Sequence, residues 1–182
     1  MVNNLRSVYK EKVIGNLFKK LSLNNCQDVP KLIKIKINRG LGLSAQNNSI
    51  LNKTIDEFRL ITGQQPIITK ARKSIAGFKI REEIPLGVTV TLRNKKMFAF
   101  LDRLINLALP RSRDFQGLNP QGFDKFGNYN LGLEEQLLFP EISYDSVDQI
   151  RGFNITFVTT AKNKTDGALL LKELGLPIRD KI

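Results

Sequence analysis

Five cations gather in one short stretch of this chain. Thr69–Arg81 reads Thr-Lys-Ala-Arg-Lys-Ser-Ile-Ala-Gly-Phe-Lys-Ile-Arg and contains no acidic residue. Like charges held so close repel one another unless a counter-charge neutralises them. Glycine and small residues between the cations suit a loop that wraps around an extended anion. The alternative is a solvated hairpin, but phosphate binding is the interpretation that the pattern favours.

The distribution of charge along the chain supports a polyanionic partner. The 182 residues include 29 basic and 17 acidic side chains, a net charge of +12. Residues 1–81 hold 16 basic and 4 acidic residues, whereas residues 82–182 hold 13 of each. The excess lies wholly in the first half, which indicates a cationic surface. Each phosphate that such a surface neutralises releases counterions. A scattered basic surface that only solvates the protein is the alternative.

The missing residue types argue against catalysis. The chain has no histidine and one cysteine, Cys26. An internal disulfide, a multi-cysteine zinc site and catalysis by serine–histidine or cysteine–histidine pairs are therefore excluded. We expect no cofactor, no metal and no enzymatic activity. A group of acids has the spacing of no known metal site, and we interpret it as a solvated or protein-binding rim: Glu134, Glu135, Glu141, Asp145 and Asp148.

Two motifs resemble known binding signatures, but their surroundings argue against both functions. Gly40–Ala45 matches a dinucleotide-binding fingerprint loosely. That fold needs a strand buried on both faces, whereas Lys34 and Lys36 place charge on one face. Arg151-Gly152-Phe153 opens like an RNA-recognition motif. Because Phe153 would share its face with Ile155 and Phe157, we assign it to the core.

The elements that would position the cations follow from periodicity. Apolar and polar residues alternate in Lys31–Asn38, Gly87–Arg93 and Phe153–Thr160, which is typical of half-buried strands. In the first segment Ile33, Ile35 and Ile37 oppose Lys34, Lys36 and Asn38. Shorter strands are expected at Ile67–Thr69 and Gly77–Ile80. The pattern predicts an antiparallel sheet with helices on one face and an open polar and basic face.

Four helices are expected to cover that sheet. They are predicted over Asn4–Leu21, from near Asn48 to Gly63, from Asn94 to Pro110, and over about Lys164–Leu174. No apolar run approaches the roughly 18 residues of a membrane helix, so we expect a soluble protein with no membrane partner. The fold class is α+β, in a single domain over residues 1–182. Pro110–Pro140 is predicted to be a long loop, rich in glycine and aromatic residues, and loops of this length are usually functional or disordered.

Lys70–Arg81, followed by Glu82–Arg93, resembles the most characteristic stretch of the family of bacterial-type large-subunit ribosomal protein five. The similarity continues in short blocks along nearly the whole chain: Val29-Pro30, Ile37–Gly40, Thr62–Gln64, Ala108–Arg111, Arg113–Phe115, Gly127–Tyr129, Phe139–Ile142, Arg151-Gly152 and Thr159–Ala161. The chain departs from the family at Gln121–Lys125, where members usually have Lys-Ser-Phe-Asp-Gly.

The resemblance implies a structural protein of the large ribosomal subunit. Family members bind 5S rRNA in the central protuberance, beside large-subunit rRNA and other 5S-binding ribosomal proteins. The family's 5S-contacting positions fall on Asn38, Gln64 and Thr91. Lys34, Lys36 and Arg93 are expected on the same open face as Asn38 and Thr91. Two other classes stay open: a metal-dependent nuclease that uses the acidic rim, and an RNA-binding or chaperone module outside the ribosome.

Further contacts are implied for the two loops. Loop 70–81 would approach the peptidyl-site tRNA with Lys70, Arg72, Lys73, Ser74, Lys79 and Arg81. Loop 110–140 would form a bridge to small-subunit protein thirteen with Arg111, Arg113, Asp114 and Phe115. Glu82-Glu83, Asp102–Pro110 and Leu131–Gln136 most resemble plastid and cyanobacterial members. We therefore expect a chloroplast ribosome, with the bacterial cytoplasm or the mitochondrion as alternatives.

Overall fold

The computed structural model describes residues 5–113, 115–144 and 147–179. The chain forms two compact units. Unit 1 comprises Met1–Ile35, Arg93–Leu131 and Thr156–Ile182, and unit 2 comprises Lys36–Leu92 and Gly132–Ile155. Whether the whole chain acts as one domain, as we expect, stays a prediction.

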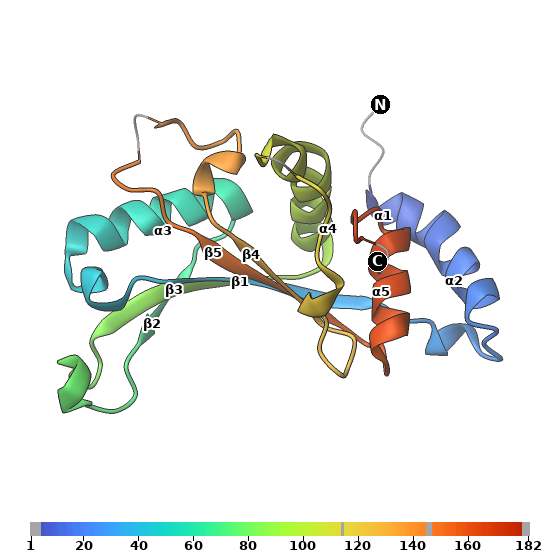
Figure 1. Cartoon of the computed structure of the whole chain (residues 1–182), viewed down its shortest axis with the longest axis horizontal. Helices are drawn as coiled ribbons and strands as arrows, with labels where there is room; N and C mark the ends of the chain where they lie inside the picture. Colours follow the sequence, from blue (N-terminus) through green and yellow to red (C-terminus); the bar gives the residue numbers. More distant parts are fainter. Residues whose placement is uncertain (1–4, 114, 145–146, 180–182) are drawn as a thin grey trace. The chain divides into compact units, whose positions relative to one another are not determined.

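Five strands form one antiparallel sheet, in agreement with the predicted α+β class (Figure 1). The order is β2-β3-β1-β5-β4, and β2 pairs antiparallel with β3. The strands are β1 (Leu32–Gly40), β2 (Ile67–Lys70), β3 (Pro85–Leu92), β4 (Tyr129–Leu133) and β5 (Phe153–Thr159).

The predicted alternation is confirmed in β3 and β5. Val88, Val90 and Leu92 are buried, whereas Thr89 and Thr91 are half-buried. In β5 the buried Phe153, Ile155 and Phe157 alternate with more exposed residues. Both strands therefore present one apolar and one polar face.

The beginning of β1 corrects the sequence prediction. Ile33 was expected in the core but is 46% exposed, and Leu32 is buried instead. Ile33 and Lys34 separate the buried Leu32 from the buried Ile35, so the alternation of buried residues shifts by one position. A shift of one residue moves a side chain to the other face of a sheet.

The helices begin and end close to the predicted positions. α1 (Leu5–Val8), a π-helical turn (Tyr9–Val13) and α2 (Ile14–Lys20) follow one another directly. α3 (Asn48–Thr62) ends at Gly63, which has a φ of 63°. α4 (Asn94–Arg103) continues through a π-helical turn (Leu104–Ala108) and a 3-10 helix (Leu109–Arg111), and α5 covers Lys164–Glu173. In the described parts of the chain, no helix is both long and apolar enough to span a bilayer.

Two segments differ from their predicted structure. The segment between Pro110 and Pro140 contains β4, which lies beside β5 in the sheet. Gly77–Ile80 is not a strand, because Ala76–Phe78 forms a 3-10 helix and Lys79 adopts a φ of 55°. These backbone angles reverse the chain, so that Ile75 and Ile80 pair as an isolated bridge.

Each unit has its own core. In unit 1, α1 packs on α4 and α2 on α5, and the rings of Tyr9 and Phe98 lie 5.6 Å apart. In unit 2, α3 packs on β3 and runs along one face of the strands (Figure 1). Phe58 and Ile61 of α3 are fully buried there, together with Ile37 of β1. The other face of these strands carries the polar side chains.

Candidate nucleic-acid interface

The face of unit 2 that points away from α3 carries a row of polar side chains. In β1, Ile37 and Arg39 are buried toward α3, so that the intervening Asn38 and the preceding Lys36 point the other way. Thr91 of β3 likewise alternates with the buried Val90 and Leu92. Within the described chain, neither the Asn38 amide nor the Thr91 hydroxyl has a hydrogen-bond partner. Both groups are therefore available to a ligand.

Gln64 reaches this row from the end of α3. The Thr62 hydroxyl donates to the carbonyl of Phe58 (2.6 Å) and accepts from the backbone N–H of Gln64 (3.2 Å). The Gln64 side-chain amide then donates to the carbonyl of Thr91 at 3.2 Å. Two of the three residues expected to contact 5S rRNA thus lie side by side, although 27 positions separate them in sequence.

The roles predicted for Lys34 and Arg93 on the open face stay predictions. Lys34 and Arg93 fall in unit 1, where Lys34 is half-buried and Arg93 is exposed. Thr89 lies in unit 2, but its hydroxyl already donates to the carbonyl of Ile37 (3.1 Å). Lys36, Asn38 and Thr91 present free polar groups on the unit 2 face, and Gln64 lies beside Thr91.

The cationic segment forms a structured hairpin between β2 and β3 (Figure 1). The backbones of Ile75 and Ile80 exchange hydrogen bonds of 2.9 and 3.2 Å, and the Ser74 hydroxyl accepts from the N–H of Glu82 (2.9 Å). Every residue of the predicted loop site is exposed: Lys70, Arg72, Lys73, Ser74, Lys79 and Arg81. The hairpin therefore presents its positive charges to solvent on an ordered backbone.

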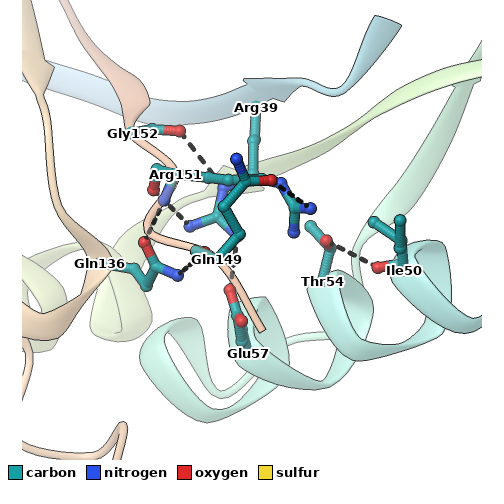
Figure 2. Close-up of polar contacts among 8 residues, drawn as sticks. All are labelled: Arg39, Ile50, Thr54, Glu57, Gln136, Gln149, Arg151 and Gly152. Carbon is teal, nitrogen blue, oxygen red and sulfur yellow. Dashed lines mark hydrogen bonds and ion pairs between the residues drawn. The ribbon is translucent and has the colours of Figure 1, made fainter. Parts of the chain in front are cut away.

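An ion pair lies directly behind the polar face (Figure 2). The Arg39 side chain is 1% exposed, and its guanidinium donates to Glu57 Oε2 of α3 at 2.5 Å. It also donates to the carbonyls of Arg151 (3.1 Å) and Gly152 (3.3 Å). The rings of Phe58 and Phe153 lie 5.0 and 5.6 Å from its central carbon, within the range of cation–π attraction.

This buried arginine was missed by the sequence analysis. Arg39 follows Ile35 and Ile37 on the covered face of β1, so the alternation of the strand could have predicted that Arg39 is buried. Burial lowers the pKa of the Arg39 guanidinium, and the hydrogen bond that it donates to the Glu57 carboxylate opposes that shift. Arginine ordinarily titrates so high that the group remains charged at neutral pH. A buried charge of this kind needs partners, and Glu57 with two carbonyls supplies them.

The network continues to the segment that precedes β5 (Figure 2). Gln136 accepts from the backbone N–H of Arg151 (2.6 Å) and donates to the carbonyl of Gln149 (2.9 Å). Gln136 itself is fully buried. These bonds hold residues 149–152 against the core of unit 2.

The residues predicted for the small-subunit bridge lie in unit 1. Arg111 ends the 3-10 helix Leu109–Arg111 and is exposed, as is Arg113. Phe115 is half-buried, and Asp114 lies outside the described residues. Their role in a bridge between the subunits stays a prediction.

The acidic rim gathers no metal-binding group among the residues that the structure describes. Asp148 pairs with Lys53 of α3, Glu134 is exposed, and Asp145 lies outside the described residues.

A polar sheet face beside a cationic hairpin is typical of a protein that docks on RNA. Comparison with known families supports this class. Residues 25–81 match the family model for ribosomal protein L5, and residues 85–178 match that for the ribosomal L5P family C-terminus. The chain belongs to the ribosomal protein L5 family, which is a family of ribosomal proteins and not of enzymes.

Individual relatives agree over nearly the full chain. The large ribosomal subunit protein uL5c of Heterosigma akashiwo is 63% identical over 179 residues, which cover 98% of this chain and 99% of the relative. The protein of the same name from Tetradesmus obliquus is 56% identical over 179 residues, with the same coverage. The large ribosomal subunit protein uL5 of Nostoc punctiforme is 54% identical over 177 residues, 97% of each chain. The predicted resemblance to plastid and cyanobacterial members is confirmed.

Proposed function

We propose that this chain is a structural component of the large ribosomal subunit that binds 5S rRNA through the polar face of unit 2. The observation that carries the proposal is the row formed by Asn38, Gln64 and Thr91. The Asn38 amide and the Thr91 hydroxyl have no partner within the described chain, and Gln64 is hydrogen-bonded to the backbone of Thr91. The relatives named as large ribosomal subunit proteins support the assignment to that subunit.

The chemistry of this row suits irregular RNA. Amide and hydroxyl groups both donate and accept, so they match 2′-hydroxyls and the edges of unpaired bases. Lys36 adds one exposed charge for a phosphate. Because β1 and β3 hold these groups on a rigid sheet, the face would recognise the shape of an RNA loop more than its sequence.

The family resemblance extends the proposal to further partners. The hairpin residues Lys70–Arg81 would contact the peptidyl-site tRNA, and their exposed charges support this role. Arg111, Arg113, Asp114 and Phe115 would contact small-subunit protein thirteen. The whole chain would act as one domain in the central protuberance, beside large-subunit rRNA and other 5S-binding proteins.

We place the protein in a chloroplast ribosome. The relatives from Heterosigma akashiwo and Tetradesmus obliquus carry the name uL5c, which supports a plastid. The Nostoc relatives keep the bacterial cytoplasm as an alternative, and the mitochondrion is the third compartment. Native protein should sediment with large subunits from the correct compartment at moderate salt.

The test is a titration of the purified protein against labelled 5S rRNA, with tRNA as competitor, at several salt concentrations. Asn38→Ala and Thr91→Ala should fold normally and weaken 5S binding by roughly 1–3 kcal/mol each, because the RNA groups that they contact lose a partner. The matched controls are Asn52→Ala, exposed on α3, and Thr165→Ala, exposed on α5. Both controls should bind like the unmodified chain.

Two outcomes would count against the proposal. Unchanged 5S affinity in both Asn38→Ala and Thr91→Ala would remove the site from the unit 2 face. Equal binding to 5S rRNA and tRNA, with a steep dependence on salt, would mean that only electrostatic attraction is present.

A further inference from the structure

The strand β2 ends the sheet and is exposed on both of its faces. β3 is its only neighbour in the strand order of the described chain (Figure 1). Ile67 is 68% exposed and Ile68 is 37% exposed, and these successive residues point to opposite faces of the strand. Lys70, the last residue of β2, is exposed as well. An open strand edge with apolar side chains is a template on which another extended chain can pair.

The hydrogen bonds of Ala71, the residue that follows β2, show which backbone groups stay open. Its N–H donates to the carbonyl of Ile84 (2.9 Å), and its carbonyl accepts from the N–H of the residue before Ile84 (3.0 Å). Both groups of Ala71 thus point toward the returning arm of the hairpin. Because these directions alternate along an antiparallel strand, the backbone groups of Lys70 and Arg72 point to the open side. In agreement, Lys70 lies opposite Pro85, which has no N–H to donate.

Cations line this open side without a compensating acid. Lys70, Arg72 and Lys73 are exposed, and none of them forms an ion pair within the described residues. The sequence contains no acidic residue between Glu57 and Glu82. A strand that paired here would therefore lie beside uncompensated positive charges. We call the following residues the β2 edge: Ile67, Ile68, Lys70, Arg72 and Lys73.

We propose that the β2 edge binds an extended acidic segment of a partner protein, which pairs with β2 as an additional strand and places carboxylates beside Lys70, Arg72 and Lys73. In this mode of binding, backbone hydrogen bonds give affinity and alternate side chains give specificity. Apolar residues of the partner would cover Ile67 and Ile68, and its acids would neutralise cations that otherwise repel one another. The site is the edge of the sheet and not its polar face, so the inference does not rest on the binding of 5S rRNA.

Two other occupants fit the β2 edge less well. A second copy of this chain would bring its own Lys70, Arg72 and Lys73 to the same edge, and like charges on paired strands are destabilising. A nucleic acid would satisfy the cations, but it has no peptide groups that could pair with the backbone of Lys70 and Arg72. An acidic strand supplies both the carboxylates and the peptide groups.

The test uses the full-length protein and a short peptide in which glutamate and valine alternate, with both ends blocked. The fluorescence anisotropy of the labelled peptide measures binding, and hydrogen exchange of the backbone amides locates the site. We expect saturable binding and slower exchange at the amides of Lys70 and Arg72. The amide of Ala71, which already donates to Ile84, should change little. An analogue with methylated backbone nitrogens keeps the charges but cannot pair as a strand, so it should bind far more weakly.

The charges of the β2 edge are tested by exchange for glutamine. Replacing Arg72 and Lys73 together should weaken binding of the peptide about tenfold, because two exposed ion pairs are lost. The same exchange of Lys10 and Lys12, which are exposed in unit 1, is the control for net charge. This control should leave the affinity for the peptide unchanged.

The apolar part of the β2 edge is tested with a second pair of variants. Ile67→Asn removes an apolar contact and the strand preference of a β-branched residue, so it should weaken peptide binding about fivefold. Leu60→Asn is the matched control, because Leu60 is 58% exposed on α3 in the same unit. Circular dichroism of both variants checks that the fold is unchanged.

Several results would overturn the proposal. These are the absence of binding, equal binding of the N-methylated analogue, unchanged exchange at Lys70 and Arg72, or equal effects of the two glutamine exchanges. Equal affinity for polyglutamate would mean that charge alone attracts the peptide. Dimers of the unmodified protein that Ile67→Asn disrupts would assign the edge to a second copy. Asn38→Ala should leave peptide binding unchanged, so a failure of the 5S site can be distinguished from a failure of the β2 edge.

Discussion

Arg39 and Glu57 form an ion pair inside unit 2, with the guanidinium 2.5 Å from the carboxylate and the Arg39 side chain 1% exposed. The next residue toward the N-terminus, Asn38, points from the same strand to the opposite face. The charge that is buried in the core and the amide proposed to contact RNA are therefore neighbours in sequence on opposite faces of β1. The ion pair joins β1 to α3, and the carbonyls of Arg151 and Gly152 join both to the start of β5.

Removing one partner of this pair should destabilise the protein strongly. Arg39→Met leaves the Glu57 carboxylate buried without its cation, which typically costs about 3–5 kcal/mol. The double variant Arg39→Met/Glu57→Leu should recover most of that loss, because two apolar side chains can replace a buried ion pair. Urea unfolding of the unmodified chain, both single variants and the double variant gives the coupling energy. Additive losses in the double variant would contradict this account.

Gly87 is required by the close approach of β1. A Cβ atom at this position would overlap with the carbonyl oxygen of Arg39 and come within 3.2 Å of Thr69 Oγ1. Gly87→Ala should therefore lower the free energy of unfolding by about 1–3 kcal/mol, as other overpacked substitutions do. Gly77→Ala is the matched control in the same hairpin, because nothing lies within 4 Å of its Cβ position. Equal stability of the two variants in urea would show that β1 shifts at little cost to make room for a Cβ atom at Gly87.

The cationic hairpin should contribute to tRNA binding through its charge alone. Replacing the exposed Arg72 and Lys73 with glutamine should lower the salt slope of tRNA binding by about two units, because roughly 0.9 unit is lost for each phosphate contact. The exchange of Lys10 and Lys12 for glutamine is the control for net charge. Asn38→Ala should leave the salt slope unchanged. Slopes that respond equally to both charge exchanges would mean that the hairpin makes no specific phosphate contact.

Tyr129 should make stability depend on alkaline pH. Burial raises its pKa from 10.0 to about 12, and its hydroxyl donates to the carbonyl of Asn119 (3.0 Å). A raised folded-state pKa adds stability that is complete below the unfolded value of 10.0 and is lost as the pH rises toward about 12. Unfolding by urea across this range should show the loss in the unmodified chain and a smaller loss in Tyr129→Phe. Identical pH profiles would show that Tyr129 ionises as readily in the folded as in the unfolded chain.

Local patterns in the sequence were sufficient to predict much of this structure. Helix ends follow from residues that act alone, such as Gly63 in its left-handed conformation. The two faces of β3 follow from strict alternation between Val88 and Leu92. Charge counts placed the positive surface in the first half of the chain, and the hairpin indeed exposes its cations. Ordered short motifs also indicated the family, which the family models confirm.

Features that depend on contacts between residues far apart in sequence were decided only by the tertiary structure. Arg39 can be buried only because Glu57 and the carbonyls of Arg151 and Gly152 accept its hydrogen bonds. No local pattern in the sequence predicts that these distant residues lie beside it. β4 is a strand because β5 offers it a hydrogen-bonding edge, and Ile33 faces outward because the alternation of β1 shifts at this point. Periodicity reports the conformation of a few successive residues, whereas ion pairing, strand pairing and register are set by contacts between segments that only folding brings together.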